Sequence, residues 1–174
     1  MEGFIHIYCG DGKGKTSCAI GLGIRAAGCG KKVLIVRFLK NNESSELKSL
    51  SFVPNITIIP CEKDYGFYWN MSMEEKVEAK ETYTNYLRNT IQMIQNDSYD
   101  MLVMDEIIAT YNHQLVNNDE FIDFLKNKPE QLEVVLTGRN PAIELLDLAD
   151  YVSNIQKVKH PFDKGIGARK GIEF

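Results

Sequence analysis

The chain has 174 residues, of which 44% are hydrophobic and 25% are charged. These values are ordinary for a soluble globular protein, and the length suits one domain with a sizeable core. The formal net charge is −4, so the chain lacks the overall basic field that favours nucleic acid, and we expect no nucleic-acid partner.

Targeting and redox signals are weak. No apolar run approaches membrane-spanning length, and the sequence does not open with the pattern of a signal peptide. The four cysteines form no CxxC pair and have no histidine at metal-ligand spacing, which is typical of free thiols in a reducing compartment. We therefore expect a cytoplasmic protein with no membrane partner.

The first predicted strand, residues 4–8, runs directly into the glycine-rich sequence CGDGKGKTS at 9–17. Glycine permits the positive φ angles and close backbone approach that turn successive N–H groups toward an anion. Ile20, Ile24 and Ala27 then recur at helical spacing, and a helix adds its N-terminal partial charge. A strand, loop and helix in this order predict a phosphate-binding loop (P-loop) that holds a triphosphate.

Within this loop, we expect Lys15 to meet the phosphates and the Thr16 hydroxyl to meet a magnesium ion. Three residues separate Gly10 from Gly14, whereas the standard P-loop has four between its outer glycines. The alternative is a glycine-rich turn that only links strand to helix. Such a turn requires neither the GKT ending nor the second lysine, Lys13.

Along the rest of the chain, short apolar runs alternate with longer amphipathic stretches. This is the pattern of βαβ units that build a parallel sheet covered on both faces. The predicted strands are 4–8, 33–38, 56–59, 101–105, 133–137 and 151–155. The predicted helices follow the P-loop and cover 72–96, 107–114, 119–127 and 141–148. We therefore predict an α/β fold of about six strands, with residues 1–174 in a single domain.

In an open parallel sheet, ligands bind at the carboxyl ends of the strands. This rule brings the P-loop, Lys40 in the polar loop 40–45, Asp105 with Glu106, and the segment 137–139 to one edge. Asp105 and Glu106 end an apolar run, where a P-loop protein places the acid that holds Mg²⁺. Alternatively, one acid caps the next helix. The sequence leaves open which acid touches the metal.

Arg139 follows a predicted strand directly. Its guanidinium is placed to bind a phosphate, or a substrate carboxylate or amide. Pairing with Asp147 or Asp150 is the structural alternative.

Two further stretches are unusual. Residues 63–71 place Phe67, Tyr68 and the only tryptophan, Trp69, in a predicted loop, which indicates contact with a ligand or partner or, alternatively, a loop that plugs the core. The C-terminal tail, 157–174, carries Phe162, Ile166, Ile172 and Phe174 among basic residues and glycines. Because these apolar side chains are costly to leave in water, we expect the tail to pack onto the domain.

Together these motifs resemble a known family. In order and spacing, they are similar to the motifs of the P-loop class of corrinoid adenosyltransferases, of the cob(I)yrinic acid a,c-diamide type. The motifs that carry the resemblance are GDGKGKTS, GLGIRAAGCGKKVLIVRFLK, GFYW, LVMDEI, VVLTGR, LLDLADYV and VKHPFDKGIGARKGIEF. The resemblance runs from about residue 4 to residue 174 and includes the shortened P-loop.

The resemblance implies a RecA-type parallel α/β fold and a homodimer. It also implies transfer of the 5′-deoxyadenosyl group of ATP to a Co(I) corrinoid, either cobalamin or cob(I)yrinic acid a,c-diamide, with release of triphosphate. A flavoprotein or another reductant would supply the electron. Because Co(I) is itself a strong nucleophile, the reaction requires no nucleophilic side chain.

The resemblance also assigns residues. Thr16 and Glu106 would bind Mg²⁺ or Mn²⁺, with Asp105 nearby. Phe67 and Trp69 match the aromatic pair that packs against the corrin and displaces its lower axial ligand, and they form the catalytic set with Lys15. The residues expected at the nucleotide, from the P-loop and from the segment after the fifth strand, are Gly10, Asp11, Gly12, Lys13, Gly14, Lys15, Thr16, Ser17 and Arg139.

Two other functions fit a P-loop protein. One is a phosphotransferase similar to nucleoside kinases, which requires a phosphate-acceptor pocket and a base. The other is a nucleotide-switched binding protein that hydrolyses ATP slowly. The aromatic loop and the tail favour the adenosyltransferase over both.

Overall fold

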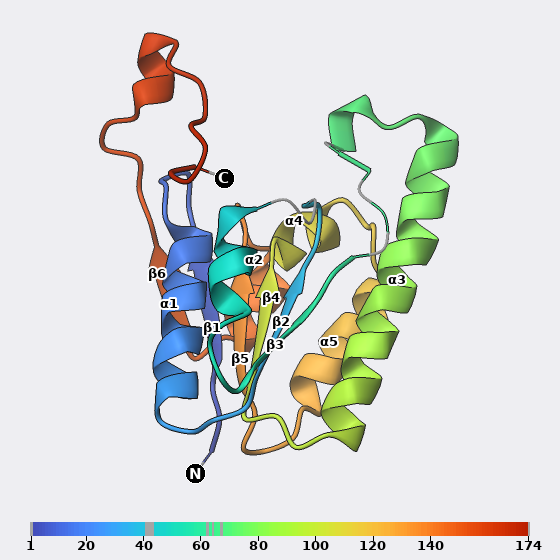
Figure 1. Cartoon of the computed structure of the whole chain (residues 1–174). Coiled ribbons are helices and arrows are strands. Elements are labelled where there is room, and N and C mark those ends of the chain that lie inside the picture. The colour runs from blue at the N-terminus through green and yellow to red at the C-terminus, as the bar shows by residue number, and fades with distance from the viewer. Residues whose placement is uncertain (1, 41–43, 62, 64, 67, 174) are drawn as a thin grey trace.

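The computed structural model describes residues 2–40, 44–61, 63, 65–66 and 68–173. Within these residues, six strands form one sheet in the order β3-β2-β4-β5-β1-β6, and all neighbouring strands pair in parallel (Figure 1). The strands are β1 (Ile5–Cys9), β2 (Val33–Arg37), β3 (Ile56–Ile59), β4 (Met101–Asp105), β5 (Glu133–Thr137) and β6 (Tyr151–Asn154). The predicted parallel α/β sheet of six strands is confirmed.

Helices cover both faces of the sheet (Figure 1). The helices are α1 (Lys15–Gly28), α2 (Ser45–Leu50), α3 (Met73–Asn96), α4 (Ile107–Asn112), α5 (Asn118–Lys126) and α6 (Ile143–Leu148). The core on one face includes buried residues of α1 and α2, and the core on the other face includes buried residues of α3, α4, α5 and α6.

Strand β2 shows why the strands appear as continuous apolar runs in the sequence. Leu34 and Val36 belong to the core beneath α3, whereas Val33 and Ile35 belong to the core beneath α1, and all four are 0% exposed. Successive side chains of a strand point to opposite faces. Because helices cover both faces, the first four positions of the strand are apolar, and only its last residue, Arg37, is charged.

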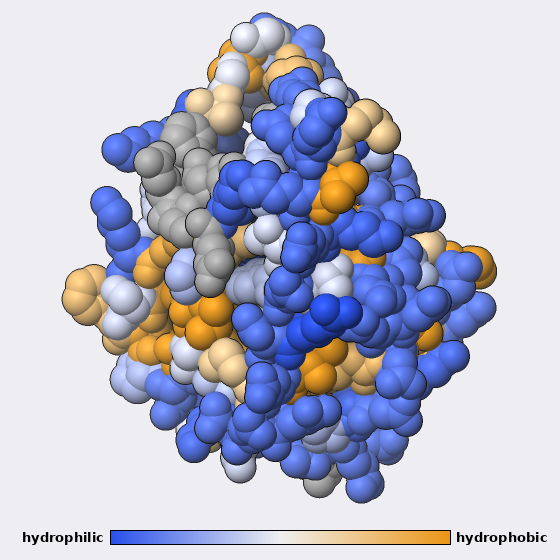
Figure 2. All heavy atoms as spheres, turned by 90° about the vertical axis from the view of Figure 1, so that its right-hand side faces the viewer, coloured by the Kyte–Doolittle hydropathy of each residue, from blue (hydrophilic) through white to orange (hydrophobic). Residues whose placement is uncertain are grey.

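Helix α3 is anchored at its start by a capping box. The Ser72 hydroxyl accepts from the backbone N–H of Glu75 at 3.1 Å, and the Glu75 carboxylate accepts from the Ser72 N–H at 2.7 Å. These bonds satisfy N–H groups that a helix start leaves free. The outer face of the molecule on the α3 side is mostly hydrophilic (Figure 2), consistent with a helix that turns one apolar stripe inward.

Two predictions about elements need correction. Helix α2 is not among the predicted helices, and its first residue, Ser45, lies in the expected loop 40–45. The helix has six residues and buries one of them, Leu50, so it leaves little helical periodicity in the sequence. The other concerns the tail, where Phe162 is 73% exposed, Ile166 49% and Ile172 55%.

The expected packing of the tail is therefore wrong for these three side chains. The tail contacts the P-loop near its two ends, where the Lys157 N–H donates to the Asp11 carboxylate at 3.0 Å and the Lys13 ammonium donates to Glu173 at 3.1 Å. Between these polar contacts the chain loops away from the sheet (Figure 1). Phe174 lies outside the described residues, and a single domain over residues 1–174 stays a prediction.

None of the helices in the described part of the chain combines the length and the apolar character needed to cross a membrane.

The close packing of α4 on the end of β5 yields a stability prediction. Gly138 has φ +151°, and a Cβ atom added there would lie 2.6 Å from Ile108 Cβ. We expect Gly138→Ala to lower the free energy of unfolding by about 1–3 kcal/mol through overpacking, measured by urea denaturation. Gly21→Ala is the matched control, because the site in α1 is open and alanine favours a helix by about 0.5–1 kcal/mol. Equal destabilisation of the two variants would contradict the packing argument.

Candidate functional site

The P-loop lies against the chain that follows β6. The Gly12 N–H donates to the Ile155 carbonyl at 2.8 Å. Added Cβ atoms would lie 2.4 Å from this oxygen at Gly10 and 2.7 Å from it at Gly12. Gly10 and Gly14 also have positive φ angles, +107° and +119°. The glycines are therefore required both for the path of the loop and for its contact with the residue after β6.

Lys15 opens α1 and turns back into the loop. Its side chain is buried, and its ammonium donates to the Gly12 carbonyl at 2.9 Å. Burial, and next the positive charge of Arg139, lower the pKa of Lys15, whereas Glu106 and Asp11 oppose this shift. A buried ammonium with too little negative charge around it is stabilised by an anionic ligand. The loop is therefore electrostatically suited to a phosphate chain.

Thr16, Lys40 and Asp105 form a second cluster beside the loop. The Thr16 hydroxyl donates to Asp105 Oδ1 at 2.9 Å. The Lys40 ammonium donates to the Thr16 oxygen at 2.8 Å and to Asp105 Oδ2 at 2.5 Å. A positive charge thus lies between the hydroxyl and the carboxylate that we expect near the metal.

Asp105 is enclosed by the protein. It is 1% exposed, and its Oδ1 also accepts from the Thr137 hydroxyl at 2.6 Å. Arg37 is its register partner across β2 and β4, and the Arg37 Nε atom lies 3.9 Å from Asp105 Oδ2. Three strands therefore converge on this one carboxylate.

Glu106 adopts a left-handed conformation with φ 61° at the N-cap of α4, and its backbone N–H donates to the Thr137 hydroxyl at 2.9 Å. Its side chain makes no capping hydrogen bond, so the capping alternative does not hold for this carboxylate. Burial raises the pKa of Glu106, and the negative charge of Asp105 raises it further, whereas Lys40 and Lys15 oppose the shift. A bound cation would relieve this crowding of negative charge.

Arg139 belongs to the same electrostatic group. Its charge acts on the pKa values of Lys15, Glu106 and Asp11. Among the described residues, it forms no ion pair with Asp147 or Asp150; the Asp150 carboxylate instead accepts from a backbone N–H of β1. The structural pairing expected as the alternative is therefore not formed, and a ligand role for Arg139 stays a prediction.

Three other candidate residues of the loop differ in their surroundings. Asp11 and Lys13 are engaged by the tail, and Glu173, the partner of Lys13, is also bound by Arg169. These bonds, with that from Arg169 the largest cause, lower the pKa of Glu173 to about 2. Lys13 must exchange this partner before it can bind a phosphate. Ser17 lies exposed in the first turn of α1.

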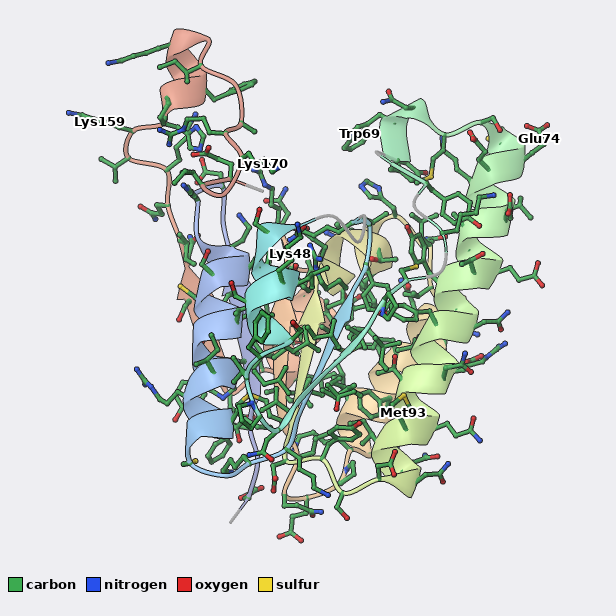
Figure 3. The ribbon with its side chains drawn as sticks, viewed as in Figure 1. Lys48, Trp69, Glu74, Met93, Lys159 and Lys170 are labelled. Atoms are coloured by element: carbon green, nitrogen blue, oxygen red, sulfur yellow. The ribbon has the colours of Figure 1, made fainter. Side chains whose placement is uncertain are left out.

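The aromatic loop presents Trp69 to solvent. Trp69 is 75% exposed and lies in the short 3-10 helix Tyr68–Asn70. Its side chain points toward the side of the molecule that carries the tail, whereas Glu74 points the opposite way (Figure 3). This exposure excludes the alternative in which Trp69 plugs the core. Phe67 lies outside the described residues.

Sequence reasoning missed His113, because an isolated histidine in a polar stretch carries no pattern. In the structure its ring stacks on Tyr68, with centroids 4.1 Å apart and planes at 9°, and it meets Trp69 edge-on at 5.0 Å. The structure thus adds one ring to the aromatic loop. Within the described residues, no three His, Cys, Asp or Glu side chains cluster as a metal site.

Known proteins are similar to this chain in sequence. The model of the family ATP:corrinoid adenosyltransferase BtuR/CobO/CobP matches residues 1–174. A corrinoid adenosyltransferase of Escherichia coli (strain K12) is 33% identical over 99% of this chain and 86% of its own length. The relative from Salmonella typhimurium is 32% identical, also over 99% of this chain and 86% of its own length.

A solved structure supports the fold alone. A KaiC-like protein from Pyrococcus horikoshii superposes with a TM-score of 0.61 at 15% identity, over 91% of this chain and 75% of that one. Because the family model spans residues 1–174 and two relatives are more than 30% identical over nearly the whole sequence, the chain belongs to the ATP:corrinoid adenosyltransferase family.

Proposed function

We propose that this chain transfers the 5′-deoxyadenosyl group of ATP to the cobalt of a Co(I) corrinoid and releases triphosphate, which is the known activity of its family. The observation that carries the proposal is the pairing of two features: a P-loop with a buried lysine, and an exposed aromatic loop that precedes α3. A phosphate site alone would equally suit a kinase. The aromatic surface suits a large, flat, apolar ligand such as a corrin.

In this reaction the cobalt electron pair attacks C5′ of ATP. The bond between C5′ and the adjoining oxygen breaks, and its electrons leave with the triphosphate. The protein must hold the triphosphate so that C5′ points at cobalt, and must neutralise the charge that grows on the leaving group. Lys15 and the N–H groups of the P-loop carry out this task, and Arg139 adds positive charge near them.

The residues around Asp105 fit a divalent cation. Thr16, Asp105 and Glu106 offer the hard oxygen ligands that Mg²⁺ or Mn²⁺ prefers, and the Lys40 ammonium already lies between Thr16 and Asp105. A cation is therefore favourable at this point. Bound there, Mg²⁺ would neutralise part of the triphosphate charge.

Trp69, with Phe67, would pack against the corrin and exclude the lower axial ligand. A four-coordinate Co(II) accepts an electron more readily, so this packing would assist reduction to Co(I). The homodimer and a separate reductant, such as a flavoprotein, are proposals that rest on the family resemblance.

One assay tests the proposed function against its alternatives. The protein is incubated with ATP, Mg²⁺ and chemically reduced cobalamin, and the products are separated by chromatography. We expect adenosylcobalamin and triphosphate in equal amounts. A phosphorylated acceptor would instead support the phosphotransferase, and ADP without an adenosylated corrinoid would support the nucleotide switch.

Lys15→Ala tests the P-loop assignment. A charge-assisted hydrogen bond to phosphate is lost, so we expect the affinity for ATP to fall by about tenfold to a hundredfold in calorimetry. Lys126→Ala is the control, because this exposed lysine lies in the last turn of α5. Unchanged ATP binding in the Lys15 variant would contradict the assignment.

Trp69→Ala tests the aromatic loop. ATP binding should stay nearly intact, whereas adenosylation should slow by roughly tenfold or more when Co(II) must first be reduced. The rate with chemically prepared Co(I) should fall much less. Equal losses from both starting states would show that Trp69 does not act through the axial ligand.

A further inference from the structure

Helix α4 runs from the edge of the sheet where Asp105 lies to Tyr68 and Trp69 of the aromatic loop. Glu106 lies at its N-cap and His113 at its C-cap, and a six-residue helix is about 9 Å long. Ile107 and Ile108 are 0% exposed in the core. The Asn112 amide donates to the carbonyls of Arg139, at 3.2 Å, and Asn140, at 2.8 Å. The helix is therefore fixed both by burial and by bonds to the segment after β5.

Three rings meet beyond the end of this helix. The His113 ring is stacked nearly parallel to the Tyr68 ring, and the planes of both rings lie at 85° to the plane of Trp69. Tyr68 and Trp69 belong to a 3-10 helix of three residues, which has too few backbone bonds to hold an exposed ring in one direction. The Tyr68 ring is half-buried and packs against the core. Trp69 is 75% exposed, so ring contacts rather than burial determine its orientation.

We propose that His113 is a positioning residue, whose ring, at the end of α4, stacks on Tyr68 and holds Trp69 in place. The effect on a corrinoid rests on the proposed function. The ring arrangement does not, because it exists in the protein alone.

The surroundings of His113 favour a neutral ring. Burial, and next the charge of Lys76, lower the pKa of His113 from its ordinary value. The Lys76 ammonium lies 4.5 Å from the centre of the Tyr68 ring, so the charged group of α3 that faces this cluster is a cation. A lowered pKa keeps the imidazole uncharged at neutral pH, and an uncharged ring stacks without the cost of burying a charge.

The single tryptophan makes the arrangement measurable in the protein alone. Trp69 is the only tryptophan of the chain, and its ring centre lies 5.0 Å from that of His113, so protonation of the imidazole should quench its fluorescence. We expect a quenching step in the wild-type protein at a pH below 6.5, the ordinary pKa of histidine. The step should be absent in His113→Phe and should move to higher pH in Lys76→Ala, because the repelling cation is gone.

Fluorescence anisotropy then tests positioning itself. We expect His113→Ala to lower the anisotropy of Trp69, because the indole loses a neighbouring ring, and His113→Phe to retain it, because phenylalanine keeps a flat ring. Circular dichroism checks that both variants are folded. A quenching step that persists in His113→Phe, or equal anisotropy in His113→Ala and the wild type, would overturn the proposal.

Activity separates this proposal from the proposed function. Starting from Co(II) cobalamin, we expect His113→Ala to slow adenosylation about tenfold with an unchanged KM for ATP, and His113→Phe to stay within about twofold of the wild type. If both variants are equally slow, the imidazole acts by its nitrogen atoms, for instance on cobalt, and positioning is overturned. If the wild type forms no adenosylated corrinoid while the fluorescence results hold, the proposed function fails and the positioning role stands.

Discussion

The arrangement of the site depends on the buried carboxylate of Asp105. Lys40 donates to it at 2.5 Å, Thr137 at 2.6 Å and Thr16 at 2.9 Å. A buried carboxylate is costly unless it is paired and hydrogen-bonded, so these three partners stabilise it. The same bonds join the ends of β4 and β5, the start of α1 and Lys40, which lies in the segment after β2. The charge therefore sets the distance between the P-loop and the rest of the sheet edge.

From this carboxylate the two halves of the site diverge. The P-loop leads toward the tail, which engages Asp11 and Lys13, whereas Glu106 leads into α4 and on to His113 and the exposed Trp69. The triphosphate side is polar and crowded with charge, and the other side is aromatic. This division suits a reaction whose leaving group is a polyanion and whose nucleophile is the metal of a flat macrocycle. A kinase would place two polar substrates there instead.

Much of the fold and of the nucleotide site could be predicted from the sequence. Three strands, Ile56–Ile59, Met101–Asp105 and Glu133–Thr137, match their predicted bounds, because turn-forming or polar residues flank these short apolar runs. The P-loop was evident because its glycines and lysines serve a local backbone geometry. The family was evident because its motifs keep their order along the whole chain.

The sequence by itself therefore determined the sheet, the P-loop and the chemistry that the family performs, since each is encoded in neighbouring residues. Only the tertiary structure decided which distant side chains contact one another and which are exposed to solvent. In the structure, Lys13 donates to Glu173, 160 residues away, the middle of the tail is exposed to solvent, and His113 stacks on Tyr68. Such contacts join residues far apart in the chain, so they depend on how the connections between strands place them in space, and no local pattern records them.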